Sequence, residues 1–197
     1  MKHVSSQGVL FDVDGVLLNW VKPFDAWILN NYSHLCTWFN PNAYNIQQRH
    51  GISSAITSAA LIRAFNSLRD FSHRPVARGD ITAVERICKK FSYAGVCSCF
   101  SSDSDVYRNR ITWLKELYGQ DTFRDFIFLD IHESKEKTLE ELRENYSVYI
   151  EDSATNAQLA HDIGYKTFLI SRPWNFEIPI SDQIIVCDTL KEVEQYV

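Results

Sequence analysis

Two aspartates stand one residue apart at the end of an apolar run near the start of the chain. Val9, Leu10 and Phe11 are typical of a buried strand, and Asp12 and Asp14 come directly after them. Like charges placed so close together are costly inside a protein unless a cation or a proton neutralises them. Paired carboxylates can bind a metal, attack an electrophile or carry a proton, so this strand end is the first candidate site.

Further polar residues follow later apolar runs or open the next helical pattern. They are Ser101, Ser102, Lys135, Lys137, Glu151 and Asp152. In open parallel sheets, ligands bind beyond the carboxyl ends of the strands, so we expect these groups to converge there. Four carboxylates cannot share a dry site unpaired, and a divalent cation would resolve the conflict. Hard oxygen ligands suit Mg²⁺ better than Zn²⁺, which predicts a magnesium site.

The elements that position these residues form an alternating series. The expected strands are short runs, mostly apolar on both faces, and they cover 9–13, 95–100, 126–131, 147–152, 166–171 and 183–188. Helical patterns lie between them, over 103–119, 133–145 and 153–164. Runs that are apolar on both faces are typical of a parallel sheet covered by helices. Alternating strands and helices predict an α/β fold with a doubly wound, Rossmann-like parallel sheet.

The interval between the first two runs has a different character. It contains no convincing strand, is rich in aromatic residues, and favours a helix over 53–70. We therefore divide the chain into a core of residues 1–16 and 80–197 and a helical insertion of residues 17–79.

The order of the motifs resembles the haloacid dehalogenase superfamily. In that superfamily an apolar strand ends in Asp-x-Asp-Gly, and a serine, a lysine and an acidic pair follow in turn. The resemblance covers residues 8–20 and roughly 80–171. It implies that Asp12 is the nucleophile that forms an aspartyl-phosphate and that Asp14 is the general acid/base. The second aspartate is present in the phosphatases of the superfamily and absent from its dehalogenases, so the resemblance implies phosphoryl transfer.

The same resemblance implies roles for the serine and the lysine. Ser101 would hold the phosphoryl group, and its alternative role is to cap the helix that follows. Lys135 would stabilise the phosphate and the nucleophile. Lys137 is the alternative lysine, and a solvated helix face is the alternative role for either of them.

The metal ligands implied by the resemblance are four acidic residues. Mg²⁺ would be held by Asp12, by the backbone carbonyl of Asp14, and by the acidic pair of Glu151 and Asp152. Glu151 stands where aspartate is commoner, and its longer side chain could act through water. Asn156, four residues after the pair, either supports the site or lies on a helix surface.

Two segments resemble a narrower group, the 5'(3')-deoxyribonucleotidases. They are DVDGVLLNW, followed by an aromatic helical segment, and KTFLISRPWN, in which residues 172–175 match the Arg/Gln-Pro-aromatic-Asn pattern of that group. The resemblance implies a nucleoside monophosphate substrate, with a preference for deoxy sugars. The Glu-Asp-Ser acidic motif departs from the group, as does Phe-Ser-Ser-Asp, where the group usually has Thr-Ser-Pro.

Other functions stay open at this point. The same chemistry could act on a sugar phosphate or on the 3'-phosphate end of a nucleic acid. A binding protein that keeps the fold without turnover is a third reading, but it would not need the aspartates, the lysine and the acidic pair together.

The position of the insertion matches that of the small helical cap that selects substrates in this superfamily. Phe24 and Trp27 lie nearest the catalytic loop in sequence and, together with Ser102, are the candidate substrate-binding residues. Burial in the core of the insertion is the alternative for each aromatic residue. The basic cluster of Arg69, His73, Arg74 and Arg78 could meet a phosphate, but a solvated surface is the simpler interpretation.

Composition sets the remaining limits. The formal net charge of −5 argues against a protein that coats nucleic acid, and no apolar stretch is long enough to span a membrane. The five cysteines show no CxxC spacing and read as reduced thiols. We expect a cytoplasmic protein that takes a small phosphorylated metabolite, and a homodimer is one oligomeric state that the sequence leaves open.

Overall fold

A computed structural model describes residues 7–68, 79–131 and 133–197. Its sheet has six parallel strands in the order β3-β2-β1-β4-β5-β6. The strands are β1 (Gly8–Phe11), β2 (Ala94–Cys99), β3 (Asp125–Leu129), β4 (Tyr146–Glu151), β5 (Lys166–Ile170) and β6 (Ile185–Cys187). The predicted doubly wound parallel sheet is confirmed, and each strand lies within its predicted run or overlaps most of it.

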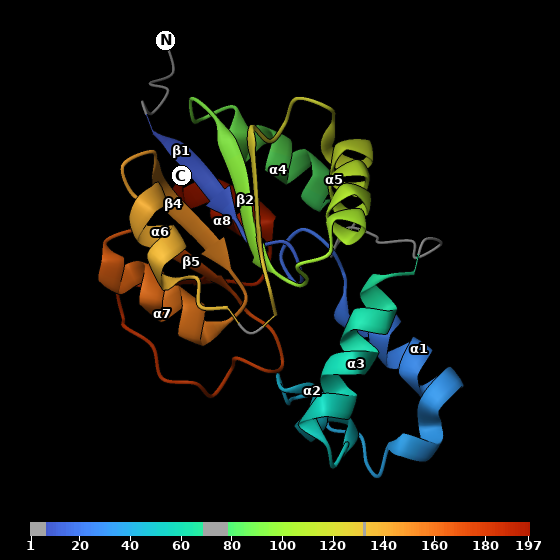
Figure 1. The fold of residues 1–197 in the computed structure, drawn as a ribbon. Helices are drawn as coiled ribbons and strands as arrows, with labels where there is room; N and C mark the ends of the chain where they lie inside the picture. The colour runs from blue at the N-terminus through green and yellow to red at the C-terminus, as the bar shows by residue number, and fades with distance from the viewer. Residues whose placement is uncertain (1–6, 69–78, 132) are drawn as a thin grey trace.

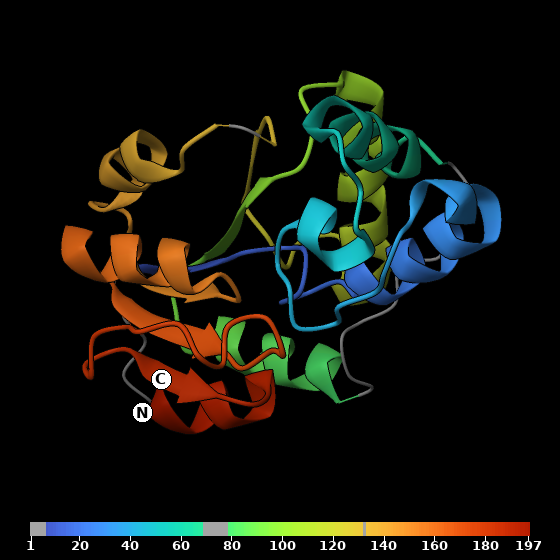
Figure 2. The same ribbon diagram turned by 90° about the horizontal axis from the view of Figure 1, so that it is seen from below.

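Helices cover both faces of the sheet (Figures 1 and 2). Helices α4 (Asp80–Cys88), α5 (Ser104–Tyr118) and α8 (Leu190–Tyr196) lie on one face, and α6 (Glu136–Leu142) and α7 (Ala154–Ile163) on the other. Successive side chains of a strand point to opposite faces, so Val9 and Phe11 pack under α4 and α8 while Leu10 packs under α6 and α7. All three side chains are fully buried.

The insertion between β1 and β2 is helical, and it lies beyond the carboxyl ends of the strands (Figure 1). It contains α1 (Val21–Tyr32), the 3₁₀ turn η1 (Ser33–Leu35), α2 (Ile46–His50) and α3 (Ala55–Asn66). Within the described part of the insertion, the only extended pairing is a single bridge from Leu18 to Asp14. The predicted helix over 53–70 corresponds to α3, which begins at its N-cap Ser54.

Aromatic side chains build the core of the insertion. The rings of Trp20 and Phe24 are stacked with their centroids 4.6 Å apart, and Phe65 meets Phe24 edge to face at 5.2 Å. Two hydrogen bonds made by side chains link this core to the end of β2. Trp20 Nε1 donates to Asn66 Oδ1 at 2.7 Å, and Asn66 Nδ2 donates to the carbonyl of Phe100, just after β2, at 2.9 Å.

Two further predictions concern the cysteines and membrane-spanning helices. The five cysteines are free thiols, as their spacing predicted. Among the described helices, none has the length and apolar character needed to cross a membrane.

Candidate active site

Asp12 and Lys135 meet at the carboxyl edge of the sheet. Asp12 is the first residue after β1, and its N–H donates to the carbonyl of Ile150 in β4 at 2.8 Å. The Nζ of Lys135 donates to Asp12 Oδ1 at 2.6 Å and to Glu151 Oε2 at 2.8 Å. All three side chains are buried, so these are charge-assisted hydrogen bonds away from solvent.

The structure separates the two candidate lysines. Lys135 stands at the start of α6 and is only 3% exposed. The side chain of Lys137 is 87% exposed, and its nearest acidic partner is Glu141 at 3.8 Å. Lys135 is therefore the lysine that contacts Asp12, and Lys137 lies on the solvated face of the helix.

Glu151 is bonded at all of its acceptor positions. Its Oε2 accepts from Lys135 and from the hydroxyl of Tyr149, the latter at 2.5 Å. Its Oε1 accepts from the N–H of Asp152 at 3.1 Å and of Ser153 at 3.0 Å. A carboxylate offers about four lone-pair positions, so an ion could reach Glu151 only by displacing one of these donors.

Asp152 completes a buried acidic cluster. Asp12, Glu151 and Asp152 each place a carboxylate oxygen within 4.8 Å of the others. Trp174 Nε1 donates to Asp152 Oδ2 at 3.2 Å, and Asn175 Nδ2 donates to the Asp152 carbonyl at 2.7 Å. This set of hard oxygen donors fits Mg²⁺, with Asp12 and Asp152 as the two side chains best placed to bind it.

The loop after Asp14 approaches Asp152 very closely. Gly15 has a φ of 91°, and a Cβ at this position would lie 2.0 Å from Asp152 Oδ2. Arg172 fixes the loop from the other side, because its Nε and Nη2 donate to the Gly15 carbonyl at 3.0 Å and 2.7 Å. Any side chain at position 15 would therefore be strained and would displace the carboxylate of Asp152.

Negative charge exceeds positive charge within the cluster. Burial and the charge of the neighbouring Glu151 raise the pKa of Asp12 to about 7, although Lys135 opposes the rise. Burial and the charges of Glu151 and Asp12 also raise the pKa of Asp152 well above its usual value. Glu151 differs, since the effect of burial on its pKa is outweighed by Lys135, and the pKa is lowered. A cation bound by Asp12 and Asp152 would neutralise this excess of negative charge.

Asp14 has a partner that the sequence analysis did not identify. Its carboxylate is about one-fifth exposed and accepts from Nη1 of Arg110, a residue of α5. Burial raises the pKa of Asp14, while Arg110 opposes that rise. A signal was present in the sequence, because Arg110 occupies the same helical row as the buried Val106 and Leu114.

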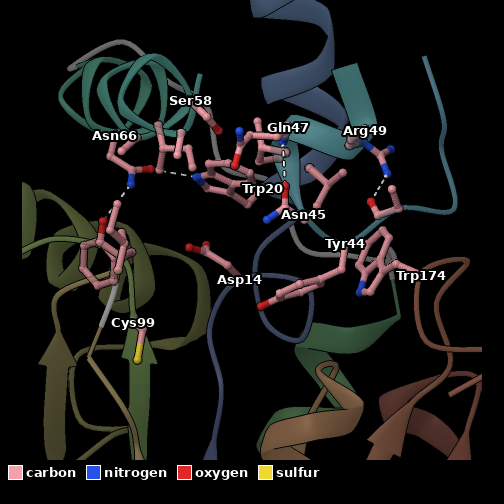
Figure 3. A pocket seen from close by; sticks show the side chains of 18 of the residues that line it. Asp14, Trp20, Tyr44, Asn45, Gln47, Arg49, Ser58, Asn66, Cys99 and Trp174 are labelled. Carbon is pink, nitrogen blue, oxygen red and sulfur yellow. Dashed lines mark hydrogen bonds between the residues drawn. The ribbon is translucent and has the colours of Figure 1, made fainter. Parts of the chain in front are cut away.

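A cavity of about 320 Å³ opens between the insertion and the sheet edge. Figure 3 shows Asp14 at its floor, with Trp20, Tyr44 and Trp174 among the surrounding side chains. Asn45 also lines it; its Oδ1 is used to cap α2. The cavity thus combines apolar ring faces with polar groups next to the acidic cluster.

The predicted aromatic ligand contacts lie elsewhere. Phe24 is fully buried in the core of the insertion, and Trp27 packs against the same cluster. Neither is among the residues that line the cavity of Figure 3. They were predicted as ligand contacts because they lie nearest the catalytic loop in sequence, but both rings pack against Phe65 of α3.

The two serines after β2 are placed differently from each other. Ser101 is buried, and its Oγ accepts from the N–H of Asp103 at 3.0 Å. Asp103, not Ser101, is the N-cap of α5. Ser102 is exposed. In the described part of the chain, neither hydroxyl is hydrogen-bonded to a carboxylate of the cluster, so their predicted phosphate contacts stay predictions.

The remaining candidate site residues are Asn156 and the basic cluster. Asn156 lies in the first turn of α7 and lines a second cavity of about 370 Å³ together with Tyr44 and Trp174. The basic cluster of residues 69, 73, 74 and 78 falls outside the described residues.

Comparison with known proteins identifies the fold. No protein-family model and no curated protein matches the sequence. Among solved structures, a predicted phosphoglycolate phosphatase from Haemophilus somnus superposes with a TM-score of 0.62 at 13% identity, over 97% of each chain. A HAD-superfamily hydrolase of subfamily IA from Geobacter sulfurreducens gives 0.61 at 13% identity, over 98% of this chain and 100% of its own.

A third structure contains a bound anion. It is CbbY from Rhodobacter sphaeroides in complex with phosphate, with a TM-score of 0.60 at 15% identity over 95% of this chain and 96% of that one. The chain therefore has the fold of the haloacid dehalogenase-like hydrolases over nearly its whole length. At these identities the likeness concerns the fold, and the activity has to be argued from the site.

Proposed function

We propose that this chain is a magnesium-dependent phosphomonoester hydrolase that acts through an aspartyl-phosphate on Asp12. The observation that carries the proposal is the buried contact of Asp12 with Lys135, beside Asp152 and at the edge of a cavity. A carboxylate can attack phosphorus only where cationic groups offset the charge of the phosphate. Lys135 supplies one such group.

The proposed hydrolysis has two steps. In the first, a carboxylate oxygen of Asp12 forms a bond to phosphorus, the ester P–O bond breaks, and protonated Asp14 gives its proton to the leaving oxygen. In the second, water attacks phosphorus and passes a proton to Asp14. The bond from phosphorus to Asp12 then breaks, which releases inorganic phosphate and restores the carboxylate.

The metal would be held by the acidic residues at the sheet edge. Asp12, Asp152 and the backbone carbonyl of Asp14 are the proposed ligands, with Glu151 holding Lys135 in place beside them. When bound, Mg²⁺ would neutralise charge on the transferred phosphoryl group.

A nucleoside monophosphate is the proposed substrate. Trp20, Tyr44 and Trp174 offer ring faces to a base or sugar, and Asn45 supplies an amide. The segment that resembles deoxyribonucleotidases lies at the site itself, because Trp174 donates to Asp152. A cavity of about 320 Å³ is in the range that holds a small ligand.

A sugar phosphate is the second candidate. CbbY, which shares the fold, was also crystallised with xylulose-1,5-bisphosphate. A nucleic-acid 3'-phosphate end is less favoured, since the net charge of −5 disfavours large polyanions.

The helical insertion would act as the cap of this enzyme. It supplies Trp20 and Tyr44 to the cavity and lies over the carboxyl edge of the sheet (Figure 1). By covering the site it would exclude bulk water from the phosphoenzyme and select what enters.

A phosphomonoester panel tests the proposal. Purified protein with excess Mg²⁺ is offered deoxynucleoside 5'-monophosphates, sugar phosphates and a 3'-phosphorylated oligonucleotide. We expect phosphate release to be fastest from the deoxynucleotides and to stop when EDTA is added. Faster release from sugar phosphates would overturn the substrate class, and no release from any ester would overturn the hydrolase.

A further inference from the structure

A fully buried arginine reaches the site from helix α5. Arg110 is 0% exposed, and its Nη1 donates to Asp14 Oδ1. The guanidinium carbon lies 4.4 Å from the centroid of the Phe100 ring, within cation–π range. Asp14 and Phe100 line the cavity and Arg110 does not, so the arginine approaches Asp14 from the protein interior.

Stability alone does not account for an arginine at this position. Nε and Nη2 of Arg110 are buried without a hydrogen-bond partner among the described residues. Unpaired buried donors cost free energy. An apolar residue would continue the buried row of Val106, Leu114 and Tyr118 without that cost, and replacing a buried ion pair by apolar groups is often neutral or stabilising.

The helix that carries Arg110 is fixed to the sheet edge. The hydroxyl of Tyr118 donates to the carbonyl of Leu17, in the loop after Asp14, at 2.7 Å. The hydroxyl of Tyr107 donates to the carbonyl of Phe128 in β3 at 3.0 Å. The guanidinium therefore stands on a rigid element tied to the same loop that it contacts.

We propose that Arg110 is the positioning residue for Asp14, and this inference rests on the proposed function. Arg110 holds one carboxylate oxygen, Oδ1, and leaves Oδ2 free to turn toward the cavity. Proton transfer to a leaving oxygen requires the carboxyl group within hydrogen-bond reach and in the correct orientation. Without the arginine, the Asp14 side chain would rotate freely, and protonation of the leaving group would slow.

Leaving-group dependence gives a readout that a structural role would not move. An alkyl ester such as glycerol 2-phosphate needs a proton on its departing oxygen, whereas 4-nitrophenyl phosphate departs as a stable anion. For Arg110→Met we expect kcat/KM for glycerol 2-phosphate to fall about 100-fold. For 4-nitrophenyl phosphate we expect a fall of less than about fivefold, because that reaction draws little on a general acid.

Three further variants complete the experiment. Arg110→Lys keeps a cation and should recover a substantial part of the alkyl-ester rate. Arg108→Met removes an exposed arginine from the same helix and should leave both rates unchanged. In an Asp14→Asn background, Arg110→Met should have almost no further effect on the ratio of the two rates, because the positioned group is already gone.

Several outcomes would overturn the inference. These are equal losses on both esters, no loss on either, or a full additional loss in the Asp14→Asn background. If Arg110→Met does not fold, the rates on the two esters are measured for Arg110→Lys, both alone and combined with Asp14→Asn. The ratio of the two rates in these variants then tests the inference in the same way. Failure of the wild-type protein to hydrolyse these two esters and every ester of the phosphomonoester panel would instead refute the proposed function, and the inference with it.

Discussion

Two buried ionic clusters in this molecule are built from similar residues but are bonded differently. At the sheet edge, Lys135 lies between Asp12 and Glu151. In the helical insertion, Arg49 binds Asp25 through two hydrogen bonds of 2.8 Å and 2.7 Å. His50 adds a contact of 2.9 Å to the same aspartate, and Arg49 also donates to the carbonyls of residues 41 and 43.

The pKa of the central aspartate distinguishes the two clusters. Burial raises the pKa of Asp12 to about 7. Burial would also raise the pKa of Asp25, but the hydrogen bonds from Arg49 and His50 hold it below its usual value. In the insertion cluster, Arg49 and His50 both contact the carboxylate of Asp25, whereas the sheet-edge cluster has a surplus of negative charge. A surplus of buried charge, rather than burial alone, marks a functional site.

Removing the proposed nucleophile should separate chemistry from folding at the sheet edge. In Asp12→Asn, we expect turnover of a substrate ester with Mg²⁺ to fall on the order of 10⁴-fold or more, because an amide cannot form the phosphoenzyme. Asparagine has a similar size, and Lys135 keeps Glu151 as its anionic partner. The Tm should therefore stay within a few degrees of the wild type. Initial rates and thermal unfolding test this, and a rate above about a hundredth of wild type would refute the covalent route.

Removing the lysine should affect stability and chemistry together. Lys135→Met leaves Asp12 and Glu151 buried without their cation, which costs about 3–5 kcal/mol of unfolding free energy in urea titrations. The matched control is Lys137→Met on the exposed face of α6, with an expected change within about 0.5 kcal/mol. Equal effects of the two substitutions would contradict the assignment of Lys135 to the buried cluster.

Breaking the insertion cluster should have the opposite profile to Asp12→Asn. In Asp25→Asn we expect a loss of about 3 kcal/mol of unfolding free energy, because the buried guanidinium of Arg49 loses its carboxylate. The turnover number should change little, while KM should rise as the loop before Tyr44 loosens. Glu85→Gln, at an exposed pair with Lys89, is the control. If Asp25→Asn lost turnover while its free energy of unfolding stayed unchanged, the contrast drawn between the two clusters would be wrong.

A rise in pH should weaken the metal-free protein through Asp12. With a pKa raised from 3.8 to about 7, folded Asp12 holds a proton at pH values where the unfolded chain has released it. Without metal, the free energy of unfolding should therefore fall as pH rises from about 4 to about 7, by roughly 1–3 kcal/mol.

Metal should reverse that trend, because protons and Mg²⁺ compete for the same oxygens. Stabilisation by Mg²⁺ should grow from pH 5 to pH 8 (a span chosen to bracket the pKa of about 7 at Asp12). Thermal unfolding in EDTA and in Mg²⁺ measures both effects. Equal stabilisation by Mg²⁺ at the two pH values would be inconsistent with binding at Asp12.

The sheet edge could be predicted from the sequence because its geometry follows from strand order. Parallel strands end at one edge, so Asp12 after β1 and Asp152 after β4 had to lie close together. The sequence favoured Lys135 but left Lys137 as an alternative, since both open the same helix. Burial in the structure makes that choice.

The cavity wall could not be predicted in the same way. Helical periodicity shows which residues of the insertion face inward, but not which element they face. Phe24 and Trp27, predicted from their closeness in sequence to the catalytic loop, pack within the insertion. Tyr44 and Trp174 line the cavity from irregular segments with no periodicity at all. Arg110 lies 96 residues from its partner Asp14, and only the tertiary fold brings them together.

The hydrogen bond between Trp20 and Asn66 has a mechanical consequence. These residues stand at the beginning and near the end of the described insertion, yet their side chains touch at 2.7 Å, and Asn66 is tied to the carbonyl of Phe100. The first and last described helices of the insertion are thus anchored together beside the end of β2. A substitution at Asn66 would therefore loosen both helices from the sheet edge at once.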